Sequence, residues 1–153
     1  MENDIKKILI SENDIQNRVK KLADEINRDY KDKDLLLVCI LKGSIMFMGD
    51  LMKYINIYAK VEFMSVSSYG NSTVSTGSVR ILKDLDMSIE NKEILIVEDI
   101  IDTGITLKYV CNYLKGKGAN SVEIVTLLDK PSGRKVDIKS KYVGFEVGNE
   151  FVI

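Results

Sequence analysis

Residues 94–107, ILIVEDIIDTGITL, constrain the fold more than any other stretch of the chain. The first four residues form an apolar, largely β-branched run, which is typical of a parallel strand buried on both faces. Beyond a Thr-Gly-Ile-Thr turn, apolar residues recur at helical spacing from Leu107 to Leu114. The segment therefore predicts a strand that leads directly into a helix, the kind of junction at which open α/β sheets bind ligands.

Three carboxylates, Glu98, Asp99 and Asp102, crowd this junction. Two such charges about 5.5 Å apart, at an effective dielectric constant of 20, repel by about 3 kcal/mol. A metal ion, sugar hydroxyls or a developing positive charge on a substrate would offset that repulsion. The alternative interpretation makes Asp102 an N-cap and the other two solvated acids at a strand end. Three acids next to a Thr-Gly-x-Thr turn favour the functional interpretation.

The turn itself suits a phosphate monoester. Gly104 lets the backbone approach a ligand closely, and the first N–H groups of the following helix lack partners within the helix. Thr103 and Thr106 add hydroxyl donors. Acids for a sugar and amides for its phosphate thus lie within one loop.

The rest of the chain alternates between predicted helices and strands. Ser11 followed by Asp14 resembles a capping box, and apolar residues at helical spacing then predict a helix that ends near Tyr30. Strands are expected at 35–41, 57–66, 79–82, 121–128 and 142–147, and a further helix at 44–55. With 153 residues and 45% hydrophobic content, this rhythm predicts one α/β domain, 1–153, with a mostly parallel central sheet flanked by helices.

Residues 67–78, SSYGNSTVSTGS, are polar and show no periodicity. A stretch of this length inside a compact domain is either a flexible lid over a binding site or a disordered surface hairpin. The sequence alone favours neither.

Composition argues against several classes of function. Twenty-two basic and twenty-three acidic residues leave a net charge of -1, which favours neither a nucleic acid nor an anionic membrane as partner. The chain has no histidine, so Ser-His-Asp and Cys-His catalysis are excluded and proton transfer falls to a carboxylate or a lysine. Cys39 and Cys111 lie in apolar surroundings, as expected of buried thiols in a reducing cytoplasm. No stretch predicts a signal peptide or a membrane span, so a cytoplasmic protein is expected.

Residues 97–107, VEDIIDTGITL, resemble the phosphoribosyl pyrophosphate (PRPP) motif of type I phosphoribosyltransferases, most closely that of members that act on hypoxanthine and guanine. Further segments agree with the family in order: LKGS at 41–44, SSYG at 67–70, STG at 75–77, LLDKP at 127–131, YVGFE at 142–146 and NEFV at 149–152. The resemblance spans nearly the whole chain. It implies the type I phosphoribosyltransferase fold, with a flexible lid loop.

The resemblance also implies a reaction. Members join a purine nitrogen to C1 of PRPP with the help of Mg²⁺ and release pyrophosphate, through a transition state in which the ribose resembles an oxocarbenium ion. The expected substrates are hypoxanthine and guanine, with xanthine as a further candidate, and the products are IMP and GMP. A homodimer or homotetramer is expected.

By match to the family motif, Asp102 would be the catalytic base at purine N7, and Glu98 and Asp99 would hold the ribose hydroxyls directly or through Mg²⁺. The other implied contacts are Thr103, Gly104, Ile105, Thr106 and Leu107 for the 5′-phosphate, Lys42, Gly43 and Arg134 for pyrophosphate, Ser68 and Tyr69 in the lid, Lys130 for the purine 6-oxo group, and Phe151 and Val152 against the base. The Leu41-Lys42 peptide can be cis in the family. The alternative interpretation makes Lys42 and Lys130 solvated lysines and Phe151 a core residue, and only the resemblance gives them a functional role.

Relatives continue past the Phe-Val segment with a short tail that carries an aspartate and an arginine. The chain that ends at Ile153 is therefore expected to bind PRPP and Mg²⁺ but to turn over slowly. A PRPP-sensing regulator on the same fold is the alternative from another class of function. Such a regulator would need a basic surface for nucleic acid.

Overall fold

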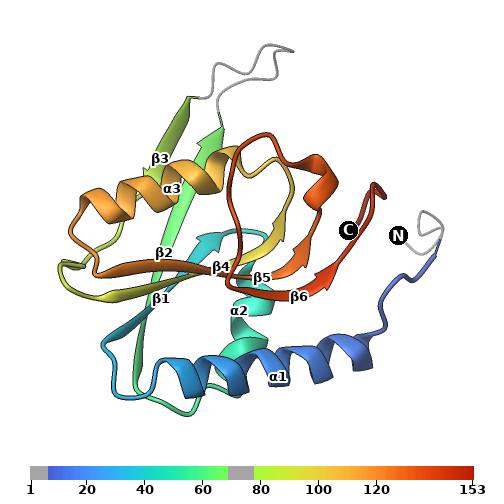
Figure 1. Ribbon diagram of the computed structural model, residues 1–153, viewed down its shortest axis with the longest axis horizontal. Helices are drawn as coiled ribbons and strands as arrows, with labels where there is room; N and C mark the ends of the chain where they lie inside the picture. Colours follow the sequence, from blue (N-terminus) through green and yellow to red (C-terminus); the bar gives the residue numbers. More distant parts are fainter. Residues whose placement is uncertain (1–6, 69–77) are drawn as a thin grey trace.

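The structure, a computed structural model, describes residues 7–68 and 78–153. In chain order the elements are α1 (Glu12–Asp29), β1 (Leu35–Leu41), α2 (Ile45–Met52), β2 (Ala59–Ser68), β3 (Val79–Lys83), β4 (Glu93–Ile101), α3 (Ile105–Gly116), β5 (Ser121–Asp129), the 3₁₀ turn η2 (Pro131–Gly133) and β6 (Tyr142–Glu146). The strands form one sheet in the order β3-β2-β1-β4-β5-β6 (Figure 1). Only the β2–β3 pair is antiparallel, so the predicted mostly parallel sheet is confirmed.

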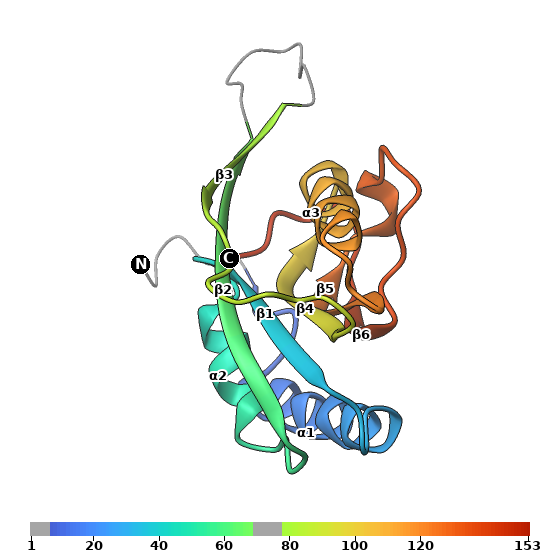
Figure 2. The same ribbon diagram turned by 90° about the vertical axis from the view of Figure 1, so that its left-hand side faces the viewer.

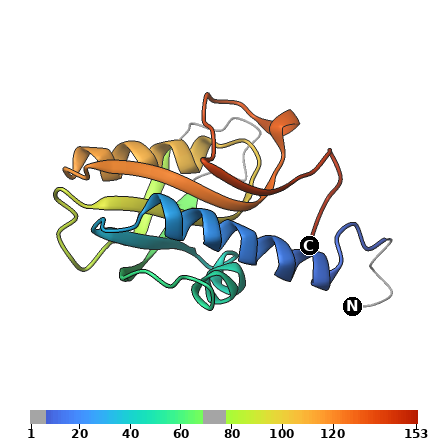
Figure 3. The same cartoon turned by 60° about the horizontal axis from the view of Figure 1, so that its bottom comes forward.

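Two apolar clusters cover the two faces of this sheet, because successive residues of a strand point to opposite sides. On β1, Leu35 and Leu37 pack towards α1 and α2, whereas Leu36 and Val38 pack towards α3. Figures 2 and 3 show α3 on the side of the sheet opposite α1 and α2. The central strands are therefore buried on both faces, which explains their continuous apolar runs.

The first helix follows the predicted pattern. The Ser11 hydroxyl accepts a hydrogen bond from the Asp14 N–H at 3.1 Å, so the N-cap is confirmed. The helix buries Val19, Leu22 and Ile26 completely. Each such side chain contributes roughly 1.5–3 kcal/mol when it is removed from water, and this burial fixes α1 across the sheet.

The element bounds differ from the expected ones at several points. Strand β4 was expected at 94–97 but continues to Ile101, because Glu98 pairs with Thr126 and Ile101 with Asp129 in the parallel ladder with β5. The helix expected at 44–55 ends at Met52, and the strand expected at 57–66 runs from Ala59 to Ser68. The turn η2 was not predicted. Cys39 and Cys111 are free and buried, as predicted.

Among residues 7–68 and 78–153, no helix has both the length and the apolar character needed to cross a membrane.

Candidate active site

The carboxyl ends of three neighbouring parallel strands meet at one edge of the sheet. Strand β1 ends before Lys42 and Gly43, β4 ends before Asp102, and β5 ends before Lys130. All the described residues of the expected site except Ser68, Phe151 and Val152 follow one of these ends or lie at the end of β4. Tyr69, the second expected lid residue, lies outside the described residues.

Glu98 and Asp99 lie in the last four residues of β4 and are both partly buried, so they are not the fully solvated acids of the alternative interpretation. Burial raises the pKa of the Glu98 carboxyl to about 8, and the neighbouring Asp99 charge raises it further in the same direction. Glu98 therefore carries a proton at neutral pH unless a cation comes near. Asp99 accepts a hydrogen bond from the Ile100 N–H at 2.9 Å.

The loop after β1 approaches Asp99 closely. A Cβ atom on Gly43 would lie 3.0 Å from Cγ of Asp99, so only glycine lets the two segments touch in this way. The Leu41-Lys42 peptide is cis, as the family resemblance predicts. Lys42 is exposed. The structure thus brings the expected pyrophosphate loop beside the acids of β4.

The two acids fit a magnesium ion as part of a ternary site. Mg²⁺ is usually bound by one or two carboxylates together with substrate phosphates and water, and not by a cage built only of protein. In the part of the chain that the structure describes, no group of three or more metal-ligating side chains occurs. Glu98 would have to release its proton to hold such a cation, and a cation that arrives with a phosphorylated ligand would itself favour the ionised form.

The turn at 103–107, expected to hold the 5′-phosphate and called the phosphate loop below, has the backbone that its sequence predicts. Gly104 adopts φ of +79°, in the left-handed region, and stands at the N-cap of α3 without a capping side chain. Thr106 and Leu107 lie in the first turn of α3, but the Leu107 side chain is buried in the core, which leaves only its backbone for a ligand. The Thr103 hydroxyl accepts a hydrogen bond from the Ile105 N–H at 3.4 Å. Beyond the Ile105 N–H, the first turn of α3 therefore offers the N–H groups of Thr106 and Leu107 to an anion.

Asp102 and Lys130 come together across two strands. The Lys130 ammonium lies 3.8 Å from the Asp102 carboxylate, and the Lys130 N–H donates to the carbonyl of Ile101 at 2.9 Å. The Lys130 side chain is only 15% exposed, so the interpretation as a solvated surface lysine is wrong. The Asp102 side chain is 52% exposed and remains open to a ligand.

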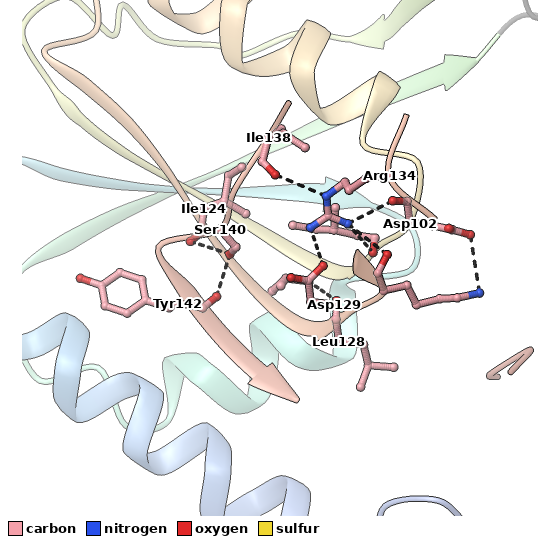
Figure 4. Close-up of polar contacts among 11 residues, drawn as sticks. Asp102, Ile124, Leu128, Asp129, Arg134, Ile138, Ser140 and Tyr142 are labelled. Atoms are coloured by element: carbon pink, nitrogen blue, oxygen red, sulfur yellow. Dashed lines mark hydrogen bonds and ion pairs between the residues drawn. The ribbon is translucent and has the colours of Figure 1, made fainter. Parts of the chain in front are cut away.

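Arg134, which the family resemblance assigns to pyrophosphate, lies beside Gly104, because a Cβ atom there would be 3.5 Å from the Arg134 Cδ. Its guanidinium turns inward and donates to the carboxylate of Asp129 and to backbone carbonyls that include those of Ile101 and Asp102 (Figure 4). The Arg134 side chain is 17% exposed. The turn after β5 folds back onto the end of β4, and the guanidinium lies between them.

The carboxyl-terminal residues follow β6, and the Ser132 hydroxyl of η2 donates to the Asn149 side chain at 2.6 Å. Phe151 is 91% exposed, so the interpretation as a core residue is wrong, and Val152 is partly buried. Ser68 ends β2 and is exposed.

Asp129 and Gly133 received no role from the sequence. The only signal for Asp129 was an acid at a strand end beside Lys130, and nothing in the sequence pointed to Gly133.

Comparisons with known proteins agree with this geometry. The family model of the phosphoribosyl transferase domain matches residues 10–153. The chain is 55% identical over its whole length to the hypoxanthine-guanine phosphoribosyltransferase of Bacillus subtilis, of which it covers 85%, and 54% identical to that of Staphylococcus aureus, of which it covers 86%. A crystal structure of a hypoxanthine phosphoribosyltransferase from Staphylococcus aureus superposes with a TM-score of 0.95 at 54% identity, over 99% of this chain and 82% of the other.

Proposed function

The chain belongs to the phosphoribosyltransferase family, and we propose from this premise that it transfers the phosphoribosyl group of PRPP to hypoxanthine or guanine. The products are IMP or GMP and pyrophosphate, so the activity is purine salvage. The observation that carries the proposal is the juxtaposition at one sheet edge of a carboxylate with an ammonium 3.8 Å away and an uncapped helix N-terminus. A 6-oxopurine needs the carboxylate and the ammonium, and its sugar phosphate needs the helix N-terminus next to them.

Each group at the edge has a proposed part in the reaction. The amides of the first turn of α3, with Thr103 and Thr106, hold the 5′-phosphate, and Lys42 with Gly43 holds pyrophosphate. Glu98 and Asp99 orient the ribose hydroxyls. When bound there, Mg²⁺ would neutralise charge that develops on the leaving pyrophosphate.

Proton transfer falls to Asp102, which accepts the proton from purine N7 as the new bond to C1 forms. The Lys130 ammonium donates to the 6-oxo group, and because an ammonium only donates, it discriminates against the amino group of adenine. Phe151 stacks on the base, with Val152 supplying backbone contacts. Ser68, at the end of β2, is one of the two proposed lid residues, and the other, Tyr69, lies outside the described residues.

The alternative of a PRPP-sensing regulator gains no support, since the relatives that match across the whole chain are named as enzymes. We further propose that the chain works in the cytoplasm as a homodimer or homotetramer. Exposed apolar side chains on α2, Ile45 and Met46, offer part of a contact surface for that assembly. Sedimentation velocity would give the number of chains.

A purine panel tests the proposal. Purified protein is mixed with PRPP, Mg²⁺ and, in turn, hypoxanthine, guanine, xanthine or adenine, and pyrophosphate release is measured. We expect hypoxanthine and guanine to be converted at least tenfold faster than adenine, and Lys130→Met to reduce that ratio. Binding of PRPP without any purine-dependent release would favour the regulator.

A further inference from the structure

The turn after β5 lies against the end of β4 and against Asp102, which follows it. The Arg134 side chain lies between the two segments (Figure 4). Its Nη1 donates to the carbonyl of Asp102 at 3.0 Å and to that of Ile101 at 3.2 Å. Its Nη2 donates to the Asp129 carboxylate, and its Nε to the carbonyl of Ile138 at 3.3 Å. Nη1 also donates to the carbonyl of Lys130 at 3.4 Å, so one side chain links five positions on three segments.

This arrangement depends on the chemistry of arginine. The guanidinium is planar, always charged, and presents five N–H donors in a rigid fork, so it can bind a carboxylate and several carbonyls at once. The side chains of Arg134 and Asp129 are 17% and 14% exposed, so their charges are largely shielded from water and compensate each other. A lysine in this position would have a single nitrogen with three donors and could not make all of these bonds at once.

Gly133 adds a second restraint on the same acid. A Cβ atom on Gly133 would lie 3.1 Å from Cγ of Asp102 and closer still to Oδ1. The Asp102 carboxylate thus rests directly against the turn, where the Lys130 ammonium is 3.8 Å away. The φ angle of Gly133 is not positive, so the backbone does not require glycine there and the absence of a side chain matters only for space.

We infer that Arg134 is a positioning residue, which holds the backbone of Asp102 while Gly133 leaves room for its carboxylate. The inference rests on the proposed function, in which Asp102 accepts a proton from the purine. It is distinct from the contact with pyrophosphate that the family resemblance implies for Arg134. Since the turn also carries Lys130, the same restraint sets the distance between the group that takes the proton and the group that selects the base.

Kinetics can distinguish positioning of Asp102 by Arg134 from a direct contact of Arg134 with pyrophosphate. If it positions Asp102, Arg134→Lys and Arg134→Gln should each lower kcat at least tenfold and leave the Kd of PRPP, measured by calorimetry with Mg²⁺, within twofold. Arg28→Gln is the matched control, because the Arg28 side chain is 73% exposed on α1. Unchanged kcat in Arg134→Lys, or a tenfold loss of PRPP affinity with kcat retained, would overturn the inference.

Glycine variants test the second restraint without disturbing the guanidinium. Gly133→Ala should lower kcat at least fivefold through displacement of the Asp102 carboxylate. Gly116→Ala is the control, because a Cβ at Gly116 meets nothing within 4 Å. Equal kcat in the two variants would contradict the role given to Gly133. Thermal unfolding of every variant shows whether a loss of kcat reflects a loss of fold.

A readout that needs no turnover keeps this inference distinct from the proposed function. In protein labelled with ¹³C at aspartate, the Asp102 carboxyl resonance, assigned with Asp102→Asn, should shift in Arg134→Gln and Gly133→Ala but not in Gly116→Ala. An unmoved resonance would overturn the inference even if the enzyme is active. Inactive parent protein with the expected shifts would instead overturn the proposed function alone.

Discussion

Asp102 and Glu98 are acids of one short segment, yet they stand in different environments. Burial and the charge of Asp99 keep Glu98 protonated near neutral pH, whereas half of the Asp102 side chain is exposed beside the Lys130 ammonium. The chemistry of each acid follows from its surroundings. Asp102 is open to a ligand, as the base role proposed for it requires, whereas Glu98 is placed to respond to a cation.

Replacing Asp102 by Asn should lower kcat at least a hundredfold, because the amide keeps the shape of the side chain but cannot accept a proton. Affinity for PRPP should change less than threefold, since the phosphate loop is untouched. Steady-state kinetics and calorimetry measure the two quantities. Equal turnover in variant and parent would remove Asp102 as the base.

Glu98 should make the ligand-free protein less stable as the pH rises. The pKa of Glu98 is about 8 in the fold against an ordinary value of 4.5, so the folded chain keeps a proton that the unfolded chain releases. Stability is then full below about pH 4.5 and falls as the pH rises through about 8, by up to about 5 kcal/mol. Relative to Glu98→Gln, the parent should lose stability between pH 5 and pH 9 in urea unfolding.

Exposed Glu90 supplies the control for that experiment, because its side chain faces water. Glu90→Gln should follow the parent at every pH. If Glu98→Gln also follows the parent between pH 5 and pH 9, Glu98 ionises normally and the burial argument fails.

Among the secondary-structure elements, β6 depends on α1. It is an edge strand paired with β5 alone, and Arg18 of α1 donates to its carbonyls at Gly144, at 2.9 Å, and Val143, at 2.6 Å. The Tyr142 hydroxyl donates to Asp29 at 2.6 Å. These hydrogen bonds with α1 hold β6, the strand that precedes Phe151, against the helix.

Arg18→Ala should lower the free energy of unfolding by about 2–3 kcal/mol, because hydrogen bonds from a charged donor contribute about 1.5–3 kcal/mol each and water replaces part of the loss. Urea denaturation measures the change. Arg28→Ala, on the same helix but 73% exposed, should change stability by less than about 0.5 kcal/mol. Similar losses in the two variants would mean that Arg18 is also only a surface residue.

The start of α3 leads to a prediction about binding. Changing Thr103 and Thr106 together to Val should weaken PRPP binding by about 1.5–4 kcal/mol and not abolish it, because the backbone amides of the helix remain. Calorimetry of PRPP with Mg²⁺ gives the difference. An unchanged affinity would place the phosphate elsewhere.

At the scale of the whole molecule, the site is assembled from the ends of β1, β4 and β5 and the start of α3. A ligand that bridges them binds only the folded chain and should stabilise all of it. At a hundred times its Kd, PRPP with Mg²⁺ should add about 2.7 kcal/mol, which raises Tm by about 5–10 °C in a domain of this size. Differential scanning fluorimetry should show a smaller rise with PRPP or Mg²⁺ alone, and equal rises would contradict a joint site.

Much of the fold could be predicted from local patterns. The apolar runs at 35–41 and 94–97 identified the central strands, and the cap at Ser11 identified the start of α1. The end of β4 was placed too early, because Glu98 and Asp99 are polar and their place in the strand depends on pairing with β5. The turn η2 has three residues and no periodicity, so no pattern could predict it.

The sequence by itself determined the junction of β4 and α3, because its acids, its glycine turn and its threonines are consecutive and their proximity is covalent. Only the tertiary structure decided which distant groups join them. Gly43 meets Asp99, Lys130 approaches Asp102, and Arg134 turns inward. These contacts depend on how the ends of three strands align at the sheet edge, and that alignment comes from the pairing of segments that are distant in the sequence.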